Sequence, residues 1–391
     1  MSMSRTAATF APPVMEARRW IDGISFPADR PLINVSQAAP VEPPPAPLRQ
    51  AIADAALTDD EAHLYGPVLG LPALRSELAT HWSEDYAGTI PSEAVGITSG
   101  CNQAFAAAIH ALTGEGDEVL LPTPWYFNHK MWLDMAGVRA VPVPTGNDLL
   151  PDPDRVAGLI TDRTRAIVLV TPNNPGGVEY PRDLIDAMMD LASSRDLKLI
   201  VDETYRDFHA QNGPPHRLFQ RADWEHTLIH LYSFSKAYRL TGHRVGAVVA
   251  ARETLAEIEK FLDTVAICPG QIGQRAALWG MRNLRQWLAG ERDEILDRRA
   301  AMADGFARLA PQGWRLLGVG AYFAYAEHPF DIPSDDLARR LVTEAGILLL
   351  PGTMFQPDGS EAGKQQVRLA FANLDRAGIG VLIDRLAALA F

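Results

Sequence analysis

The sequence predicts an α/β protein, in which a mostly parallel β-sheet lies between helices and a smaller α+β domain follows it. Between about residues 94 and 262, short apolar segments alternate with segments of helical spacing. The apolar segments carry no alternating polar residues, which is typical of strands buried on both faces of a sheet. The chain after residue 283 differs, because it begins with a long charged helix and continues with shorter strands and helices.

Each element is predicted from its local pattern of apolar residues. In the first region, strands are expected at residues 94–100, 118–122, 165–170, 197–202, 228–233 and 246–250, and helices at 48–57, 71–82, 103–112, 181–194 and 253–262. The later region is expected to hold a helix at 283–310 and strands at 314–319, 321–326, 347–352 and 366–372.

A proline-rich segment, APVEPPPAPL at residues 39–48, marks the first domain boundary, since it fits neither a helix nor a strand. Residues 1–45 are expected to form an N-terminal segment that joins the small domain, with 46–285 as the large domain and 286–391 as the small C-terminal domain. The first 13 residues look like a loose, partly ordered tail.

Composition excludes several classes of protein. The chain has 391 residues, of which 47% are hydrophobic, so it can bury a large core and is not intrinsically disordered. Its 36 basic and 48 acidic residues give a net charge of −12, which disfavours a nucleic-acid partner. No apolar run is long enough for a membrane helix. Only Cys101 and Cys268 are present, which excludes a disulfide scaffold and fits a reducing, cytoplasmic setting.

The most informative segment is LYSFSKAYRLTGHRVG at residues 231–246. An expected strand ends at Ser233, Ser235 and Lys236 follow at once, and Arg244 comes eight residues after the lysine. Taken alone, Lys236 could be a surface lysine in a loop. Alternatively, it is a Schiff-base lysine beside a phosphate site, because hydroxyl and guanidinium groups bind phosphate through hydrogen bonds of ~1.5–3 kcal/mol each.

A second signal lies in LKLIVDETYRDF, residues 197–208, where an expected strand ends in Asp202 and Tyr205 follows. Asp202 could simply cap a turn. However, an acid at the carboxyl end of a parallel strand points into the usual ligand crevice of an α/β sheet. There it could keep a pyridine nitrogen protonated, as pyridoxal phosphate requires.

Two weaker signals also follow strands. GITSGCNQAF at 96–105 leads from a strand into a helix, whose first N–H groups could hold phosphate. TPNNPGG at 171–177 forms a turn in any case, and its side-chain amides could also bind a ring oxygen. Either segment could be an ordinary connection.

These four signals occur in order along the chain, and no HExxH, P-loop, GxSxG or metal-spaced histidine motif competes with them. The combination resembles the fold-type I pyridoxal-phosphate aminotransferases of class I/II, in the aspartate aminotransferase-like superfamily. The resemblance extends from about Ile33 to Phe391, and SFSKAYRLTGHRVG is its most specific motif. It implies a seven-stranded sheet in the large domain, pyridoxal 5′-phosphate as the cofactor, and no metal.

The resemblance implies a role for each matching residue. Lys236 would hold the cofactor covalently and shuttle the proton of the substrate α-carbon. Asp202 would pair with the pyridinium nitrogen, and Tyr205 and Asn174 would hydrogen-bond the phenolic oxygen. Lys236, Asp202 and Tyr205 are thus the expected catalytic residues. The phosphate would be bound by Gly100, Cys101, Asn102, Ser233, Ser235 and Arg244.

Further contacts are implied in the same way. Tyr126 would stack on the pyridine ring, with its neighbour Trp125 as the second choice. Arg368, in QVRLAFAN at 366–373, would grip the substrate α-carboxylate bidentately, beside Asn174. Tyr65, in HLYGPVLGLPALR, would reach the phosphate of a partner subunit, which predicts a homodimer.

The chain also departs from the family pattern. Ala38 stands near a position that usually holds glycine, so its methyl group could narrow or reshape the substrate pocket. The usual Asn-Pro-Thr-Gly reads Asn-Pro-Gly-Gly here, and His243 replaces a common aromatic residue. Family members often have cis peptide bonds before the prolines that match Pro124 and Pro175, and the same is expected here.

The implied activity is transfer of an amino group from an L-amino acid to a 2-oxo acid by a ping-pong cycle. The segment 263–274 holds no second arginine for a side-chain carboxylate, which favours a neutral or aromatic donor, as do Trp20, Trp125 and Tyr126. A carbon–sulfur β-lyase or another fold-type I enzyme would share the same cofactor contacts. An aminotransferase-like regulatory domain is a remote alternative, because such proteins carry an N-terminal winged helix, whereas only about 32 residues precede the matching region here and the chain is acidic.

Overall fold

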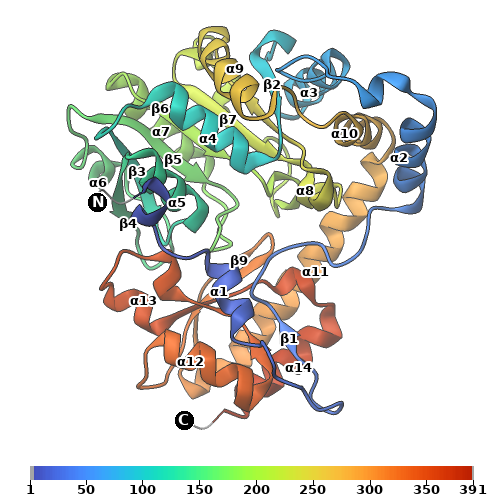
Figure 1. Cartoon of the computed structure of the whole chain (residues 1–391). Coiled ribbons are helices and arrows are strands. Elements are labelled where there is room, and N and C mark those ends of the chain that lie inside the picture. The colour runs from blue at the N-terminus through green and yellow to red at the C-terminus, as the bar shows by residue number, and fades with distance from the viewer. Residues whose placement is uncertain (1–3, 390–391) are drawn as a thin grey trace.

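The computed structural model describes residues 4–389, which form two lobes. The large lobe contains a seven-stranded sheet and the helices around it, and the small lobe contains a four-stranded sheet (Figure 1). This is the α/β arrangement that the sequence predicted.

The sheet of the large lobe has the strand order β2-β8-β7-β6-β5-β3-β4. Its strands are β2 (Val95–Thr98), β3 (Glu118–Thr123), β4 (Arg139–Pro144), β5 (Thr164–Val170), β6 (Lys198–Asp202), β7 (Leu228–Ser233) and β8 (Gly246–Val249). Only β8 runs antiparallel to its neighbours, so the sheet is mostly parallel as expected. Sequence reasoning missed β4, whose two prolines and exposed ends fit an edge strand rather than a buried one.

Both faces of this sheet are buried in its central part, which explains why the central strands are largely apolar. In β6, Leu199 and Val201 face one hydrophobic cluster, whereas Ile200 faces the other. The covering helices are α2 (Ala46–Thr58), α3 (Pro72–Asp85), α4 (Cys101–Leu112), α5 (Phe127–Ala136), α6 (Pro153–Ala157), α7 (Arg182–Ser194), α9 (Arg252–Ala266) and α10 (Gln271–Asn283). The short helix α8 (Phe234–Ala237) directly follows β7.

The small lobe is built around an antiparallel sheet of order β12-β13-β10-β9. Its strands are β9 (Arg315–Gly320), β10 (Phe323–Glu327), β12 (Leu350–Pro351) and β13 (Gln366–Leu369), and its helices are α12 (Ser334–Arg340), α13 (Glu361–Gln365) and α14 (Arg376–Ala387). Both ends of the chain contribute, since β1 (Ile33–Asn34) pairs in parallel with β11 (Ile347–Leu348).

The N-terminal segment contacts both lobes. Helix α1 (Pro13–Arg19) lies near the small lobe, while a 3₁₀ turn at Arg5–Ala8 lies against α5 of the large lobe. Thr9 donates a hydrogen bond of 2.9 Å to Asp134 there. Of the expected loose, partly ordered tail, residues 5–9 are held against the large lobe and Pro13 begins α1, whereas residues 10–12 are exposed without regular structure and residues 1–3 lie outside the described part of the chain.

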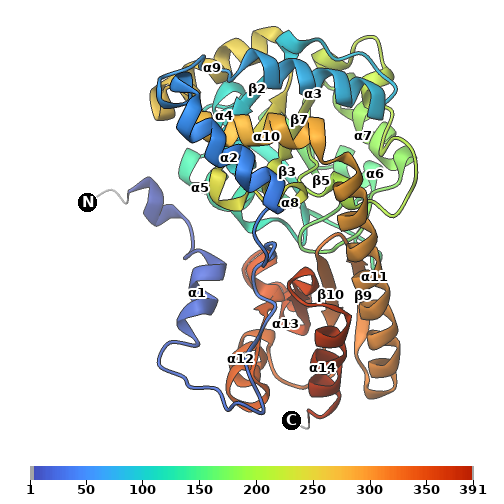
Figure 2. The ribbon, with the colours of Figure 1, turned by 90° about the vertical axis from the view of Figure 1, so that its right-hand side faces the viewer.

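Helix α11 (Arg285–Leu309) connects the lobes (Figure 2). Trp287 and Leu288 near its start pack against the core of the large lobe, whereas Met302 and Phe306 belong to the core of the small lobe. The domain limits at 45/46 and 285/286 remain a prediction, and α11 would cross the second one at its first residue.

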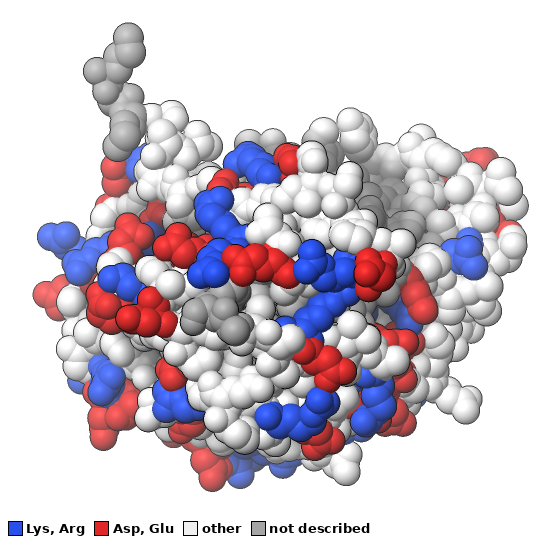
Figure 3. All heavy atoms as spheres, turned by 90° about the horizontal axis from the view of Figure 1, so that it is seen from below, with Lys and Arg blue, Asp and Glu red and all other residues white. Residues whose placement is uncertain are grey.

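The peptide bonds before Pro124 and Pro175 are cis, as expected, and so is the bond before Pro172. Within residues 4–389, no helix is long and apolar enough to cross a membrane. On the face seen in Figure 3, acidic and basic side chains are interspersed rather than gathered by sign.

Candidate active site

A cavity of about 400 Å³ lies where the carboxyl ends of the parallel strands meet the small lobe. It brings together most of the residues predicted from the sequence: Ala38, Cys101, Asn102, Tyr126, Asn174, Asp202, Tyr205, Ser233, Ser235, Lys236, Arg244 and Arg368. Gly100 adjoins it as the residue before α4. Tyr65 does not line it.

Lys236 enters the cavity from α8, one turn after the end of β7. Its Nζ donates a hydrogen bond of 2.5 Å to the carbonyl oxygen of Ala38. Burial, together with the positive charges of Arg368 and Arg244, lowers the pKa of Lys236 to about 8. The amine is therefore far easier to deprotonate than an exposed lysine, which suits a nucleophile that must be neutral to react.

Asp202 ends β6 and forms the acidic part of the cavity. Burial opposes its ionisation, but His129, at 3.2 Å, and hydrogen bonds from Thr204 outweigh burial and lower the pKa of Asp202. His129 in turn stacks on Phe105, with ring centres 3.8 Å apart. Sequence reasoning missed His129, although it stands one helical turn after Tyr126 on α5.

One end of the cavity is shaped to take a phosphate. Cys101 and Asn102 open helix α4, whose first N–H groups have no acceptors within the helix. Arg244 adopts a left-handed backbone conformation (φ 49°) and donates to Ser235 Oγ at 3.3 Å. Gly100 has a φ of 89°, which favours glycine, and a Cβ there would also meet the Arg244 guanidinium where it now lies.

Tyr126 closes one side of the cavity. Its hydroxyl accepts a hydrogen bond of 2.8 Å from Asn128 and donates to Asn102 at 3.3 Å. Trp125, the second choice, does not line the cavity, and its backbone N–H is bound to the carbonyl of Phe355. The structure therefore favours Tyr126, and Asn128 is a contact that sequence reasoning missed.

Arg368 lies on β13 opposite the lysine and is almost completely buried, with 2% of its surface exposed. It donates to Asn174 Oδ1 at 3.0 Å and to the carbonyl of Ser36, while its Nε has no partner. Burial lowers the pKa of Arg368 to about 10. No carboxylate among the described residues pairs with it, so this guanidinium is available to an anionic ligand.

The comparisons with known proteins agree with this geometry. Residues 30–386 match the family model of aminotransferase class I and II. The chain belongs to this family. It is therefore a pyridoxal-phosphate-dependent amino-acid transaminase.

Two sequence relatives illustrate the range of the family. The chain is 29% identical to the aspartate/prephenate aminotransferase of Thermus thermophilus, over 79% of this chain and 78% of that protein. It is 31% identical to the arginine–pyruvate transaminase of Pseudomonas aeruginosa, over 81% of this chain and 80% of the relative.

Solved structures share the whole architecture. The aspartate aminotransferase of Thermus thermophilus with maleate superposes with a TM-score of 0.87 at 25% identity, covering 99% of both chains. The N-succinyldiaminopimelate aminotransferase of Mycobacterium tuberculosis superposes with a TM-score of 0.88 at 26% identity, covering 100% of both.

The residues present fit the cofactor of this family. The cavity of the aminotransferase is lined by three cationic side chains, Lys236, Arg244 and Arg368, and by one carboxylate, Asp202. This excess of positive charge suits a ligand that carries a phosphate and, with substrate, an α-carboxylate. Cys101 lies in the same cavity, but burial and the nearby Asp202 raise its pKa, so its thiol stays protonated.

A second buried cluster lies close behind Asp202. Glu203, His216 and His230 have potential metal-ligand atoms within 4.8 Å of one another. However, His216 Nδ1 accepts the N–H of Leu218 at 3.3 Å, so its Nε2 must carry the proton that faces Glu203. In this tautomer the protonated Nε2 of His216 lies 3.4 Å from the Glu203 carboxylate and has no lone pair for a metal ion.

The lowered pKa of Lys236 gives a testable pH dependence. Uptake of pyridoxal phosphate by the cofactor-free aminotransferase should speed up as pH rises through about 8, because only the neutral amine reacts with an aldehyde. In Arg368→Gln, a positive charge that disfavours the ammonium form is gone, so the midpoint should move to higher pH. Stopped-flow absorbance across a pH series measures both profiles.

Arg376→Gln, an exposed substitution on α14, should leave the midpoint in place. A wild-type midpoint near the value of a free lysine, or one that Arg368→Gln leaves unchanged, would contradict the electrostatic explanation.

Proposed function

We propose that this aminotransferase transfers the amino group of a neutral or aromatic L-amino acid to a 2-oxo acid, and that it works as a cytoplasmic homodimer. The observation that carries the proposal is that the Lys236 amine lies in the same charged cavity as Arg244 and Arg368, both of which lower its pKa. Two free cysteines, Cys101 and Cys268, support a reducing compartment.

Pyridoxal phosphate, when bound, supplies an electron sink for the α-carbon of an amino acid. The chain supplies the rest. Arg244, Ser233, Ser235 and the first turn of α4 would bind the phosphate, and Tyr126 would cover the ring. Asp202, kept ionised by His129 and Thr204, would hold a proton on the pyridine nitrogen. Tyr205 and Asn174 would hydrogen-bond the phenolic oxygen.

Arg368 would position the substrate through its α-carboxylate, because a guanidinium binds both carboxylate oxygens at once. That contact directs the α-carbon toward Lys236, whose neutral Nζ would take the α-proton and later return it. The burial of Arg368 would strengthen its contact with the carboxylate, since fewer water molecules screen the two charges.

The donor side of the cavity supports an uncharged side chain. Val14, Phe127 and Phe323 contribute apolar surface, and Gln37 and Asn128 contribute neutral polar groups. Of the aromatic residues first connected with the donor, Tyr126 lines the cavity, whereas Trp20 and Trp125 do not. The names of the relatives include aspartate, arginine and aromatic donors, so they do not choose among donor classes.

The homodimer is supported by an exposed apolar surface around Tyr65. Tyr65 is 80% exposed and Leu64 is 64% exposed, while Val265 and Ile267 are exposed on the neighbouring segment. The N–H of Gly66 reaches Cys268 Sγ at 3.4 Å, so these two segments lie side by side. Such a patch on a monomer is typical of a surface covered by another chain, and a twofold dimer would bring Tyr65 to the partner's cavity.

The first experiment tests the reaction itself. The wild type, mixed with an amino-acid panel and 2-oxoglutarate, should produce glutamate, and Lys236→Ala should produce none while its circular dichroism stays unchanged. Lys260→Ala, which removes an exposed lysine on α9, should keep full activity. Glutamate formation by Lys236→Ala would refute the role of Lys236, and ammonia plus pyruvate from cystathionine without glutamate would point to a β-lyase.

The donor class is tested by steady-state kinetics with the same panel. The cations of the cavity are Lys236, Arg244 and Arg368, and the cofactor and the substrate α-carboxylate would occupy them, so none remains for a side-chain carboxylate. Aspartate and glutamate should therefore show kcat/KM values at least about tenfold below those of the best neutral or aromatic donor. Aspartate as the best donor would contradict the proposed pocket.

Subunit mixing tests Tyr65. Lys236→Ala and Tyr65→Ala, each of low activity alone, should regain activity when mixed under conditions that exchange subunits. One cavity of each mixed dimer would then combine an intact Lys236 with the partner's Tyr65. No recovery from a mixture that forms mixed dimers would show that Tyr65 does not act across the interface.

A further inference from the structure

We propose that Arg239 is a positioning residue for substrate binding: it clamps a backbone strap that forms one wall of the cavity. The strap consists of residues 36–43, which connect β1 to the segment before α2 without regular secondary structure. The inference rests on the proposed transamination, because it concerns how the amino-acid donor is held.

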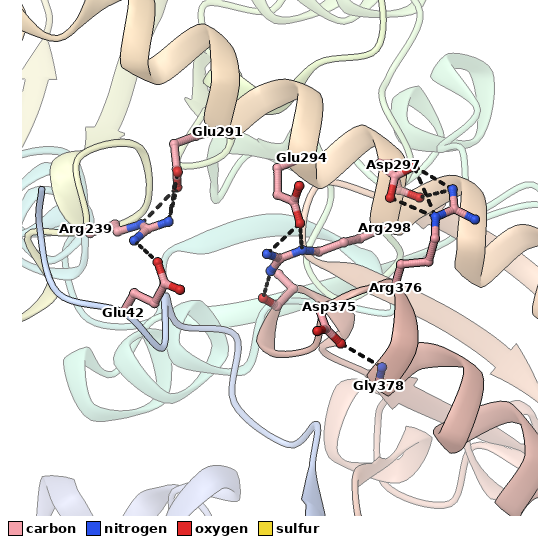
Figure 4. Close-up of polar contacts among 10 residues, drawn as sticks. Glu42, Arg239, Glu291, Glu294, Asp297, Arg298, Asp375, Arg376 and Gly378 are labelled. Carbon is pink, nitrogen blue, oxygen red and sulfur yellow. Dashed lines mark hydrogen bonds and ion pairs between the residues drawn. The ribbon is translucent and has the colours of Figure 1, made fainter.

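Arg239 joins three separate parts of the chain. Its Nε and Nη2 donate to the two carboxylate oxygens of Glu291 on α11, at 2.9 and 2.8 Å. Its Nη1 donates to Glu42 of the strap at 2.5 Å. Figure 4 shows the guanidinium between these two carboxylates. The guanidinium also lies 5.4 Å from the ring centre of Trp287, so its flat face is covered.

The backbone at Arg239 is also unusual. Its φ is 54°, in the left-handed region that residues other than glycine seldom adopt. Its N–H is hydrogen-bonded to the carbonyl of Lys236 at 3.3 Å, so it belongs to the turn that carries the reactive amine. The side chain is held in place, since only 16% of it is exposed.

The strap contacts the reactive groups of both lobes. The carbonyl of Ser36 accepts a hydrogen bond from Arg368, and the carbonyl of Ala38 accepts one from Lys236. Gln37, Ala38 and Ala39 line the cavity. A shift of this backbone would therefore move the walls around Arg368 and Lys236 together.

The far end of the strap depends on Arg239. Near Gln37, the strap is fixed by Asn373, which donates to the Gln37 carbonyl at 2.7 Å, and by Arg18, which donates to the Gln37 side chain at 2.6 Å. Within residues 4–389, Glu42 has Arg239 as its one polar partner. Loss of the guanidinium would release the strap at that end and leave the end near Gln37 attached.

The same helix offers a matched control. Arg376 on α14 forms a bidentate ion pair with Asp297 on α11, at 2.9 and 2.5 Å (Figure 4). This pair resembles the Arg239–Glu291 pair in chemistry, but both of its residues come from helices and neither contacts the strap. Its removal tests what the loss of an ion pair on α11 does without a change at the strap.

The experiment measures donor KM and kcat of the holoenzymes Arg239→Gln, Glu42→Gln and Arg376→Gln, after the wild type has been shown to transaminate. Arg239→Gln and Glu42→Gln should each raise the donor KM about tenfold and change kcat less than about threefold, since they weaken substrate binding more than chemistry. Arg239→Gln/Glu42→Gln should be no worse than the poorer single variant, because Arg239→Gln already removes the one interaction that Glu42→Gln removes. Arg239→Lys keeps the positive charge but cannot donate two parallel hydrogen bonds to Glu291. Its donor KM should lie between those of the wild type and Arg239→Gln.

Arg376→Gln should lower thermal stability as much as Arg239→Gln does, or less, and keep the wild-type KM. The proposal is overturned if Arg239→Gln keeps the wild-type KM, if Glu42→Gln does so, or if Arg376→Gln raises KM equally. An inactive wild type would instead refute the proposed function.

Discussion

The active site depends on an excess of positive charge at one cavity, and the Arg368 part of that charge is buried. Lys236, Arg244 and Arg368 face a cavity whose one carboxylate is Asp202. A buried charge without a partner destabilises a fold by several kcal/mol as an order of magnitude, so such an arrangement persists only where polar groups or a ligand offset it. Here Ser36 and Asn174 accept hydrogen bonds from the Arg368 guanidinium, and an anionic ligand would neutralise its charge. Burial lowers the pKa of Lys236, and the charges of Arg368 and Arg244 lower it further, so the cations that would bind an anion also favour the neutral amine.

A parallel sheet explains how distant residues reach this cavity. Asp202 and Ser233 end neighbouring strands, and Asn174 follows the next strand along. Because these strands run in one direction, their carboxyl ends lie at the same edge of the sheet. Side chains at those ends therefore lie close together, whatever the conformation of the loops elsewhere. This topology made the large-lobe half of the site predictable from sequence, since each residue directly follows an apolar strand.

Other features could not be predicted from local patterns. Strand β4 lies at an edge, where prolines and exposed residues hide the usual apolar signal. His129 is one of several polar residues of α5, so nothing local marks it, and its contact is with Asp202, 73 positions later in the chain. Arg239 and Glu42 are 197 positions apart, and nothing in either local sequence connects them. Such pairs exist only after the lobes and the strap have assembled, so tertiary structure is their first evidence.

Because the active site lies between two lobes, the lobes must be held in a fixed relation at the cavity, and the strap contributes to this. Lys236 belongs to the large lobe and Arg368 to the small one, so the substrate α-carbon and α-carboxylate are held by different bodies. Helix α11 joins these bodies but runs outside the cavity, and it lines none of it. The strap accepts hydrogen bonds from both reactive cations, so it links the lobes at the cavity itself. The binding geometry for an amino acid therefore depends on backbone carbonyls as well as on catalytic side chains. Donor preference can change through the strap and through the cavity residues Val14 and Asn128 while Lys236, Asp202 and Arg368 stay the same.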